Sequence, residues 1–218
     1  MSYQLLIADD HPLFRDALTM ALQTGELADC RIELASTLDE TRERLSAGNE
    51  YDLLLLDLRM PGSEGFFGLV QIRKEFPEVP LVVISGSDDP VIVARTRALG
   101  ALGFIAKSTS TRDIQAAVAR VLAGDEVWPE GLPEREDDAE IADIAQRIQD
   151  LTDQQLRVLQ QLQRGRLNKQ IAYDLSISEA TVKAHVTAIF RKLGVLNRTQ
   201  AVILANRLAM EADPSLPG

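Results

Sequence analysis

The stretch "YDLLLLDLRMPG" at residues 51–62 places four consecutive leucines directly before an aspartate, Asp57. A short, continuous apolar run is typical of a strand that is buried on both faces of a parallel sheet. A carboxylate at the end of such a strand costs free energy unless a partner compensates its charge. Asp57 is therefore either a solvated strand-end residue or part of a reactive site, and the rest of the chain must decide.

Apolar runs and helical patterns alternate five times over residues 1–124. Strands are expected at residues 3–9, 30–36, 51–57, 79–86 and 103–108. Helices are expected at residues 12–25, 37–48, 65–77, 89–100 and 110–124. In the second helix, Thr37 and Glu40 have the spacing of a capping box. Five βα units with continuous apolar strands predict an α/β domain with a flavodoxin-like, five-stranded, doubly wound parallel sheet.

The remainder of the chain has a different character. Residues 125–147 contain proline, glycine and a cluster of acidic residues, so we expect an acidic linker there. Its second half is expected to form a linker helix, because apolar residues recur at helical spacing at Ile141, Ile144, Ile148 and Leu151. Residues 148–212 carry helical patterns throughout and predict an all-α, four-helix domain of the helix-turn-helix type, with Thr152 and Gln155 as a capping box.

The formal net charge of −10 is distributed unevenly along the 218 residues. Residues 1–124 carry −6 and residues 125–147 carry −7, whereas residues 148–210 carry +5. A basic module on an acidic protein indicates a polyanionic partner for that module alone. Cys30 is the single cysteine, which excludes a disulfide framework within one chain. Without a membrane-length apolar run or a signal-peptide pattern, we expect a cytoplasmic protein with no membrane partner.

Residues able to perform chemistry end four of the five predicted strands. In chain order these are Asp9 with Asp10, Asp57, Ser85 and Lys107. The carboxyl ends of parallel strands meet at one edge of the sheet, so these side chains should converge. Three carboxylates repel one another unless a cation lies among them, and oxygen ligands suit Mg²⁺. Because Lys107 can pair with a carboxylate or a phosphoryl oxygen, the set indicates phosphoryl transfer onto an aspartate.

These residues, with the sequence "DLRMPG" at 57–62, resemble the receiver domain of bacterial two-component response regulators. The resemblance covers about residues 3–124. It implies that Asp57 is the phosphoacceptor, and that Asp10, Asp57 and the carbonyl of Arg59 ligate Mg²⁺, with Asp9 acting through water. It also implies that Ser85 and Lys107 contact the phosphoryl group, and that Phe104 is an aromatic switch. The alternative for Phe104 is ordinary core packing, and His11 is interpreted as a surface loop residue.

The helix expected at residues 178–193 has two distinct faces. Its apolar stripe consists of Val182, Val186, Ile189, Phe190 and Leu193. The opposite face is small, polar and basic, and consists of Ala180, Lys183, Ala184, Thr187 and Arg191. Such a face suits a recognition helix in the major groove of DNA, and phosphate contacts are expected from Arg166, Lys169, Lys192 and Arg198. The alternative is a helical bundle with a solvated basic face.

The segment "NKQIAYDLSISEATVKAHV" at residues 168–186 lies within a region that resembles the DNA-binding domain of NarL/FixJ/LuxR-type regulators. The resemblance implies that Lys183, Ala184 and Thr187 face the bases. It places Lys169, Thr181, His185 and Arg191 at or near the DNA backbone, and a dimer contact at Val202, Ile203 and Ala205. Internal packing is the alternative for these last three residues. Two positions depart from the family pattern, Gln155 where glutamate is common and Thr187 where some members have lysine.

Together these features predict a phosphorylation-controlled transcriptional regulator and not an enzyme. Its expected partners are a sensor histidine kinase, double-stranded DNA, RNA polymerase and, in the active state, a second copy of the chain. The unphosphorylated form either blocks its recognition helix or fails to dimerise. A receiver-like protein that dimerises without phosphorylation is one alternative. A flavodoxin-like hydrolase or nucleotide-binding protein is another, although "DDHPLF" stands where a phosphate-binding glycine loop would be expected.

Overall fold

The computed structural model describes residues 2–63, 65–131 and 138–208. The chain divides into two compact units, Met1–Asp138 and Ala139–Gly218. Among the residues described, no helix is both long enough and apolar enough to cross a membrane.

The first unit contains a five-stranded sheet in the order β2-β1-β3-β4-β5, and every neighbouring pair is parallel. This confirms the predicted fold class. Its elements are β1 (Gln4–Ala8), α1 (Pro12–Leu22), η1 (Gly25–Leu27), β2 (Arg31–Ala35), α2 (Leu38–Ser46), β3 (Leu53–Asp57), α3 (Phe66–Glu75), β4 (Leu81–Ser85), α4 (Pro90–Ala98), β5 (Gly103–Ala106) and α5 (Thr111–Leu122). The short 3₁₀ helix η1 was not expected from the sequence.

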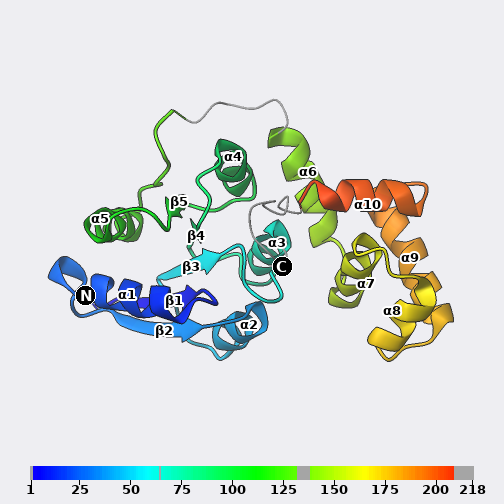
Figure 1. The fold of residues 1–218 in the computed structure, drawn as a ribbon, viewed down its shortest axis with the longest axis horizontal. Helices are drawn as coiled ribbons and strands as arrows, with labels where there is room; N and C mark the ends of the chain where they lie inside the picture. Colours follow the sequence, from blue (N-terminus) through cyan, green and yellow to red (C-terminus); the bar gives the residue numbers. More distant parts are fainter. Residues whose placement is uncertain (1, 64, 132–137, 209–218) are drawn as a thin grey trace. The chain divides into compact units, whose positions relative to one another are not determined.

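Alternate residues of the central strands point to opposite faces of the sheet, and both faces are covered by helices. Figure 1 shows α1 and α5 on one side of the sheet and α2, α3 and α4 on the other. On the α1 and α5 side, Leu5, Leu55 and Val82 form one buried cluster with Leu18 and Val118. All five residues of β3 are buried, which explains the run of four leucines before Asp57.

The predicted capping box of α2 is only half formed. The side chain of Thr37 caps the helix by accepting a hydrogen bond from the amide of Glu40. The Glu40 carboxylate does not return to Thr37; it accepts hydrogen bonds from Ser36 and pairs with Arg44. The expectation was wrong on this point because both oxygens of Glu40 have other partners, Oε2 the amide and hydroxyl of Ser36 and Oε1 the guanidinium of Arg44.

The segment predicted as a linker divides between the two units. Val127 forms a parallel bridge with Gly103 of β5, so residues before the undescribed stretch at 132–137 belong to the first unit. The predicted linker helix is α6 (Asp138–Gln149), of which residues from 139 onward belong to the second unit. Ile141, Ile144 and Ile148 on α6 are buried, so this helix contributes directly to the core of the second unit.

The second unit is entirely helical over the residues described, up to 208. After α6 come α7 (Asp153–Gln163), α8 (Asn168–Asp174), α9 (Glu179–Leu193) and α10 (Arg198–Asn206). The capping box of Thr152 and Gln155 is confirmed, and Ser178 caps α9 by accepting from the amide of Thr181. Gly194 ends α9 in the left-handed conformation (φ 69°), which glycine adopts without strain.

Candidate functional site

The acidic pocket of the first unit is built from the carboxyl ends of four adjacent strands. Asp9 follows β1, Asp57 ends β3, Ser85 ends β4 and Lys107 follows β5. Because β1, β3, β4 and β5 are neighbours in the sheet, residues separated by as many as 98 positions meet at one edge. The structure therefore brings together the residues that the sequence analysis placed at the strand ends.

Lys107 is the central cation of this pocket. Its Nζ lies 2.6 Å from Asp9 Oδ2 and 2.7 Å from Asp57 Oδ2, and both carboxylates are only 2% exposed. Burial raises the pKa of Asp57, and Lys107 opposes that shift by stabilising the charged carboxylate. Burial alone would lower the pKa of Lys107, but its bonds to Asp57 and Asp9 outweigh burial and raise it. The pair therefore keeps a cation beside the carboxylate of Asp57.

The donor set of this pocket fits a metal ion. Ligand atoms of Asp9, Asp10, His11 and Asp57 all lie within 4.8 Å of one another. Asp9 Oδ2 and Asp10 Oδ1 are buried and accept no well-oriented hydrogen bond, although Lys107 Nζ and His11 Nδ1 lie within 2.6 and 2.8 Å of them. Buried carboxylate oxygens with unused lone pairs are suitable ligands for a hard cation. The acidic cluster can therefore bind a metal.

His11 lies closer to this cluster than its sequence position predicts. Its Nδ1 lies 2.8 Å from Asp10 Oδ1 and 3.2 Å from Asp9 Oδ1, while 65% of the side chain is exposed. His11 precedes Pro12 at the start of α1, and its backbone amide also donates to Asp9. The signal was present in the adjacency of "DDHP", because His11 directly follows the two aspartates and precedes a proline that starts the helix.

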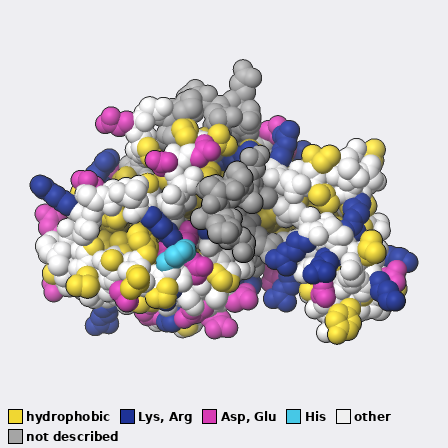
Figure 2. All heavy atoms as spheres, in the orientation of Figure 1, with side chains coloured by type: hydrophobic (Ala, Val, Ile, Leu, Met, Phe, Trp, Pro, Cys, Tyr) yellow, Lys and Arg dark blue, Asp and Glu magenta, His cyan; other side chains and the backbone are white. Residues whose placement is uncertain are grey.

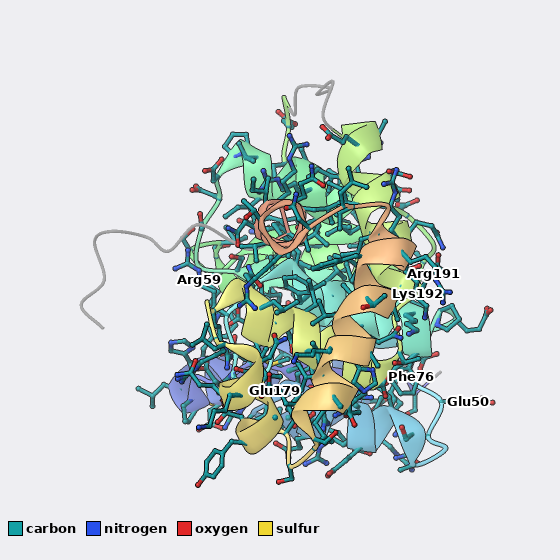
Figure 3. All side chains as sticks on the ribbon, turned by 90° about the vertical axis from the view of Figure 1, so that its right-hand side faces the viewer. Glu50, Arg59, Phe76, Glu179, Arg191 and Lys192 are labelled. Carbon is teal, nitrogen blue, oxygen red and sulfur yellow. The ribbon has the colours of Figure 1, made fainter. Side chains whose placement is uncertain are left out.

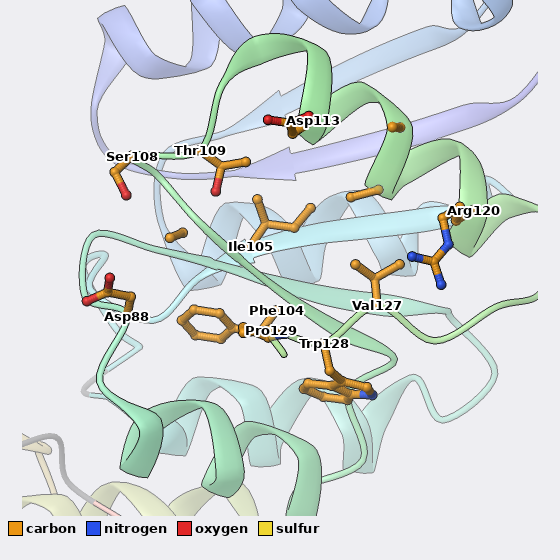
Figure 4. Close-up of a pocket in the computed structure, with 13 residues that line it drawn as sticks. Asp88, Phe104, Ile105, Ser108, Thr109, Asp113, Arg120, Val127, Trp128 and Pro129 are labelled. Carbon is orange, nitrogen blue, oxygen red and sulfur yellow. The ribbon is translucent and has the colours of Figure 1, made fainter. Parts of the chain in front are cut away.

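The remaining predicted residues lie around the pocket. The amide of Arg59 donates to Asp57 Oδ1 at 3.0 Å, which brings the backbone of Arg59 beside the carboxylate. The hydroxyl of Ser85 is fully buried and accepts from the amide of Ser87. Phe104 is 2% exposed and lines a separate pocket of about 490 Å³ with Asp88 and Trp128, shown in Figure 4.

Helix α9 of the second unit has the two faces that the sequence predicts. Val182, Ile189 and Leu193 are fully buried, so this stripe holds the helix in its core. The polar face is open to solvent, with Thr181, Lys183, Ala184, Thr187 and Arg191 all exposed. His185 is half-buried, and Lys169 on α8 is exposed. Figure 3 shows Glu179 at one end of α9 and Arg191 and Lys192 at the other.

Two of the residues predicted to contact phosphates are held by the protein itself. Lys192 Nζ donates to the carbonyl of Asp150 and to Gln155 Oε1, each at 2.8 Å. Arg198 donates to the carbonyls of Leu162 and Arg166. Their charges therefore stabilise loop and helix ends within the unit. Figure 2 shows other lysine and arginine side chains, in dark blue, spread over the surface of the second unit.

The three residues predicted for dimer contact differ in how far their side chains are exposed to solvent. Ile203 is 57% exposed and Val202 is half-buried, but Ala205 has no exposed surface. Ala205 is therefore packed internally in this structure, which agrees with the alternative of internal packing for this residue. The reason is that α10 packs against α7 and α9, and Ala205 lies on the face that meets them.

Comparison with known proteins matches a family model to each of the two units. The model of the response regulator receiver domain matches residues 5–119, and that of the bacterial regulatory proteins of the luxR family matches residues 149–205. The chain is 40% identical over 217 residues to the glycerol metabolism activator of Pseudomonas putida, covering 96% of this chain and 98% of that protein. It is 31% identical over 208 residues to the response regulator protein VraR of Staphylococcus aureus, covering 94% and 97% of the two chains.

Among solved structures, the fold is shared with RcsB in a structure of two RcsB dimers bound to two parallel DNAs. That similarity has a TM-score of 0.56 and 22% identity, and it covers 96% of this chain and all of the other. The order of the two folds along the chain, the strand-end pocket and the two matching family models agree with one another. The chain therefore belongs to the response regulators that join a receiver domain to a LuxR-type DNA-binding domain, and it is a phosphorylation-controlled, DNA-binding regulator of transcription.

Proposed function

We propose that Asp57 is the phosphoacceptor of this regulator and that a sensor histidine kinase is the phosphoryl donor. The observation that carries this proposal is the buried Asp57 carboxylate, with Lys107 Nζ held 2.7 Å from Oδ2. In the transfer, an oxygen of Asp57 forms a bond to phosphorus while the bond from phosphorus to the donor breaks. Lys107 then has a phosphoryl oxygen to bind in place of the carboxylate oxygen, and the buried Ser85 hydroxyl supplies a further contact.

We further propose that the metal of this pocket is Mg²⁺. Asp10, Asp57 and the carbonyl of Arg59 would hold it, with Asp9 acting through water. Bound Mg²⁺ supplies compensation for the negative charge of the phosphoryl oxygens. The chain itself sets the position of the attacking oxygen, because the Asp57 carboxylate is already held by Lys107 and by the amide of Arg59.

The exposed face of α9 is the proposed DNA contact. Lys183, Ala184 and Thr187 would face the bases in the major groove, while Lys169, Thr181, His185 and Arg191 would lie at the backbone. We propose binding as a homodimer, which the DNA-bound dimers of RcsB support. Of the predicted dimer residues, Val202 and Ile203 retain exposed surface for that contact. RNA polymerase is the proposed downstream partner and the cytoplasm the proposed location.

The proposed boundaries of function follow the two units. Residues 1–124 act as the receiver, and residues 148–212 act as the DNA-binding domain, of which those after 208 lie outside the described structure. The protein is proposed to be a switch and not a metabolic enzyme, because both matching families are those of transcriptional regulators and the pocket presents its own Asp57 as the phosphoryl acceptor.

Intact mass after incubation with acetyl phosphate and Mg²⁺ tests this proposal. Wild-type protein should gain the mass of one phosphoryl group, and Asp57→Asn should gain none. Asp16→Asn is the matched control, because Asp16 is an exposed carboxylate on α1, and this variant should be modified like the wild type. No gain in the wild type would favour a regulator that acts without phosphorylation. A gain in Asp57→Asn would mean that a different carboxylate is the acceptor.

A further inference from the structure

The segment Asp125–Pro129, called the strap below, lies along the free edge of the receiver sheet. The amide of Val127 donates to the carbonyl of Leu102 at 3.0 Å, and the amide of Phe104 donates to the carbonyl of Val127 at 2.9 Å. Together these bonds form a parallel bridge between Val127 and Gly103. The chain leaving α5 is therefore fixed in register with β5 before it continues toward the second unit.

Gly103 makes this close approach possible. A Cβ at position 103 would lie 2.7 Å from the carbonyl oxygen of Val127 and 3.3 Å from its Cβ. The nearer of these atoms belongs to the backbone and cannot move aside by a side-chain rotation. The strap can therefore pair with β5 only where β5 has a glycine, so the contact depends on one specific residue.

Trp128 connects the strap to a second element. The guanidinium of Arg97 on α4 lies over its indole ring, 5.7 Å from the ring centroid, a contact that is attractive between a cation and an aromatic face. Trp128, Phe104 and Asp88 line the same pocket of about 490 Å³, and Figure 4 shows Phe104 and Trp128 at its lower edge with Asp88 to one side. The strap is thus bound to β5 by its backbone and to α4 by a side chain.

Strand β5 ends at the acidic pocket, and a short loop joins the pocket residue Ser85 to the start of α4. Lys107 directly follows β5, three residues after Phe104, and its amide donates to the carbonyl of Ser85 at 2.7 Å. The loop from Ser85 leads through Asp89, which caps α4. A phosphoryl group on Asp57 would become a new partner of Lys107 and Ser85. It would therefore act on the end of β5 and on the loop that leads to α4. Any relative shift of the two elements must alter the contact between Trp128 and Arg97.

We propose that the strap is the element through which the receiver transmits its phosphorylation state to the segment between the units. In the unphosphorylated form the strap is paired with β5 and stacked against α4. Phosphorylation moves β5 relative to α4 and opens the contact between Trp128 and Arg97, which changes how the chain leaves the receiver. This inference rests on the proposed function of Asp57, and it adds a specific relay made by Gly103, Val127 and Trp128.

Fluorescence of the full-length protein tests the first step, because Trp128 is the only tryptophan of the chain. Acetyl phosphate with Mg²⁺ should shift the emission maximum and increase quenching by acrylamide, with the phosphorylated fraction measured by intact mass on the same sample. Asp57→Asn should show neither change. Mass gain without any change in emission or quenching overturns the strap proposal and leaves the phosphoacceptor intact. Absence of mass gain overturns the phosphoacceptor and the strap proposal that depends on it.

Two variants test whether the strap governs output. Gly103→Ala should expose Trp128 without phosphorylation and should reduce the difference in DNA affinity between the unphosphorylated and phosphorylated forms. Arg97→Gln should act in the same direction more weakly. Arg95→Gln is its matched control, with the same loss of charge in the last turn of α4, and should behave like wild type. If Gly103→Ala and Arg97→Gln are both phosphorylated normally and keep the wild-type dependence of DNA affinity on phosphorylation, the strap is not the relay.

Discussion

At the scale of single residues, the acidic pocket is governed by one cation among several carboxylates. Lys107 lies within 2.7 Å of both Asp9 and Asp57, whose side chains are almost fully buried. A buried charge whose partner is removed is strongly destabilising, whereas the intact pair adds little net stability. Lys107 therefore makes a pocket of acidic residues compatible with a folded protein before any metal or phosphoryl group is present.

Replacing Lys107 with methionine should destabilise the receiver by about 3 kcal/mol in the absence of divalent cations, since two buried carboxylates lose their counter-charge. Mg²⁺ should restore part of this loss, because it supplies positive charge at the same carboxylates. Urea unfolding with and without Mg²⁺ measures both effects. Lys169→Met, the same substitution at an exposed position, should change stability little. Equal stability of Lys107→Met and wild type would mean that the carboxylates take up protons or water instead.

A second residue-scale prediction concerns Glu40 at the start of α2. The bonds from Arg44 and Ser36 lower the pKa of Glu40 to about 2. Because the folded-state pKa lies below that of the unfolded chain, about 4.3, this carboxylate stabilises the fold above that pH. The contribution is lost as the pH falls toward 2. The stability gap between wild type and Glu40→Gln should therefore be largest near neutral pH and narrow between about pH 4.5 and pH 2.

Chemical denaturation across this pH range checks the prediction. Glu43→Gln is the matched control, because Glu43 is exposed on the same helix. A gap for Glu40→Gln that stays constant from pH 7 to pH 2 would show that Arg44 and Ser36 do not favour the charged form.

At the scale of elements, α9 separates two lysines by function. Lys183 has a 65% exposed side chain on the polar face, whereas Lys192 is bound to Asp150 and to Gln155 on α7. Lys183→Met should weaken DNA binding. It should change the free energy of unfolding by less than about 0.5 kcal/mol, because the ion pair of Lys183 with Glu179 is exposed and such pairs contribute little. Lys192→Met should lower the free energy of unfolding by about 2 kcal/mol, because it removes charge-assisted hydrogen bonds.

Fluorescence anisotropy with labelled DNA and urea unfolding of both variants separate these effects. The variants serve as controls for one another, since each loses one positive charge from the same helix. The opposite result, with Lys192 governing affinity and Lys183 governing stability, would mean that α9 presents a different face to DNA.

The elements also show what the sequence could predict and where it could not. Buried strands and helix caps were predictable because apolar runs and the Thr152–Gln155 spacing are local patterns. The convergence of Asp9, Asp57 and Lys107 followed from the rule that parallel strand ends share an edge. Contacts between distant segments were not predictable in this way. The bridge of Val127 to Gly103 and the bonds of Lys192 depend on where other elements lie, and no local pattern encodes that.

At the scale of the whole molecule, charge and fold are divided in the same way. The segment of residues 148–210 carries +5 within a chain of net charge −10, and it contains the exposed basic face of α9. A polyanion is attracted to the local field of such a surface, while the acidic remainder keeps net charge far from zero. Each half therefore has the electrostatics that its proposed partner requires, a cation with a phosphoryl group in one and DNA in the other.

The two units also have separate hydrophobic cores, which predicts two distinguishable unfolding transitions. Leu55 is buried in the sheet of the first unit and Ile189 in the helical core of the second. Each substitution to alanine should cost about 2–5 kcal/mol in its own unit, because a cavity replaces a large buried side chain.

Trp128 lies in the first unit and is the only tryptophan, so its fluorescence follows that unit, whereas circular dichroism follows the helices of both. Leu55→Ala should lower the fluorescence midpoint, and Ile189→Ala should leave it unchanged while lowering a circular dichroism transition. If Ile189→Ala shifts the fluorescence midpoint as much as Leu55→Ala does, the units unfold as one, and the strap would then connect two parts that already share their stability.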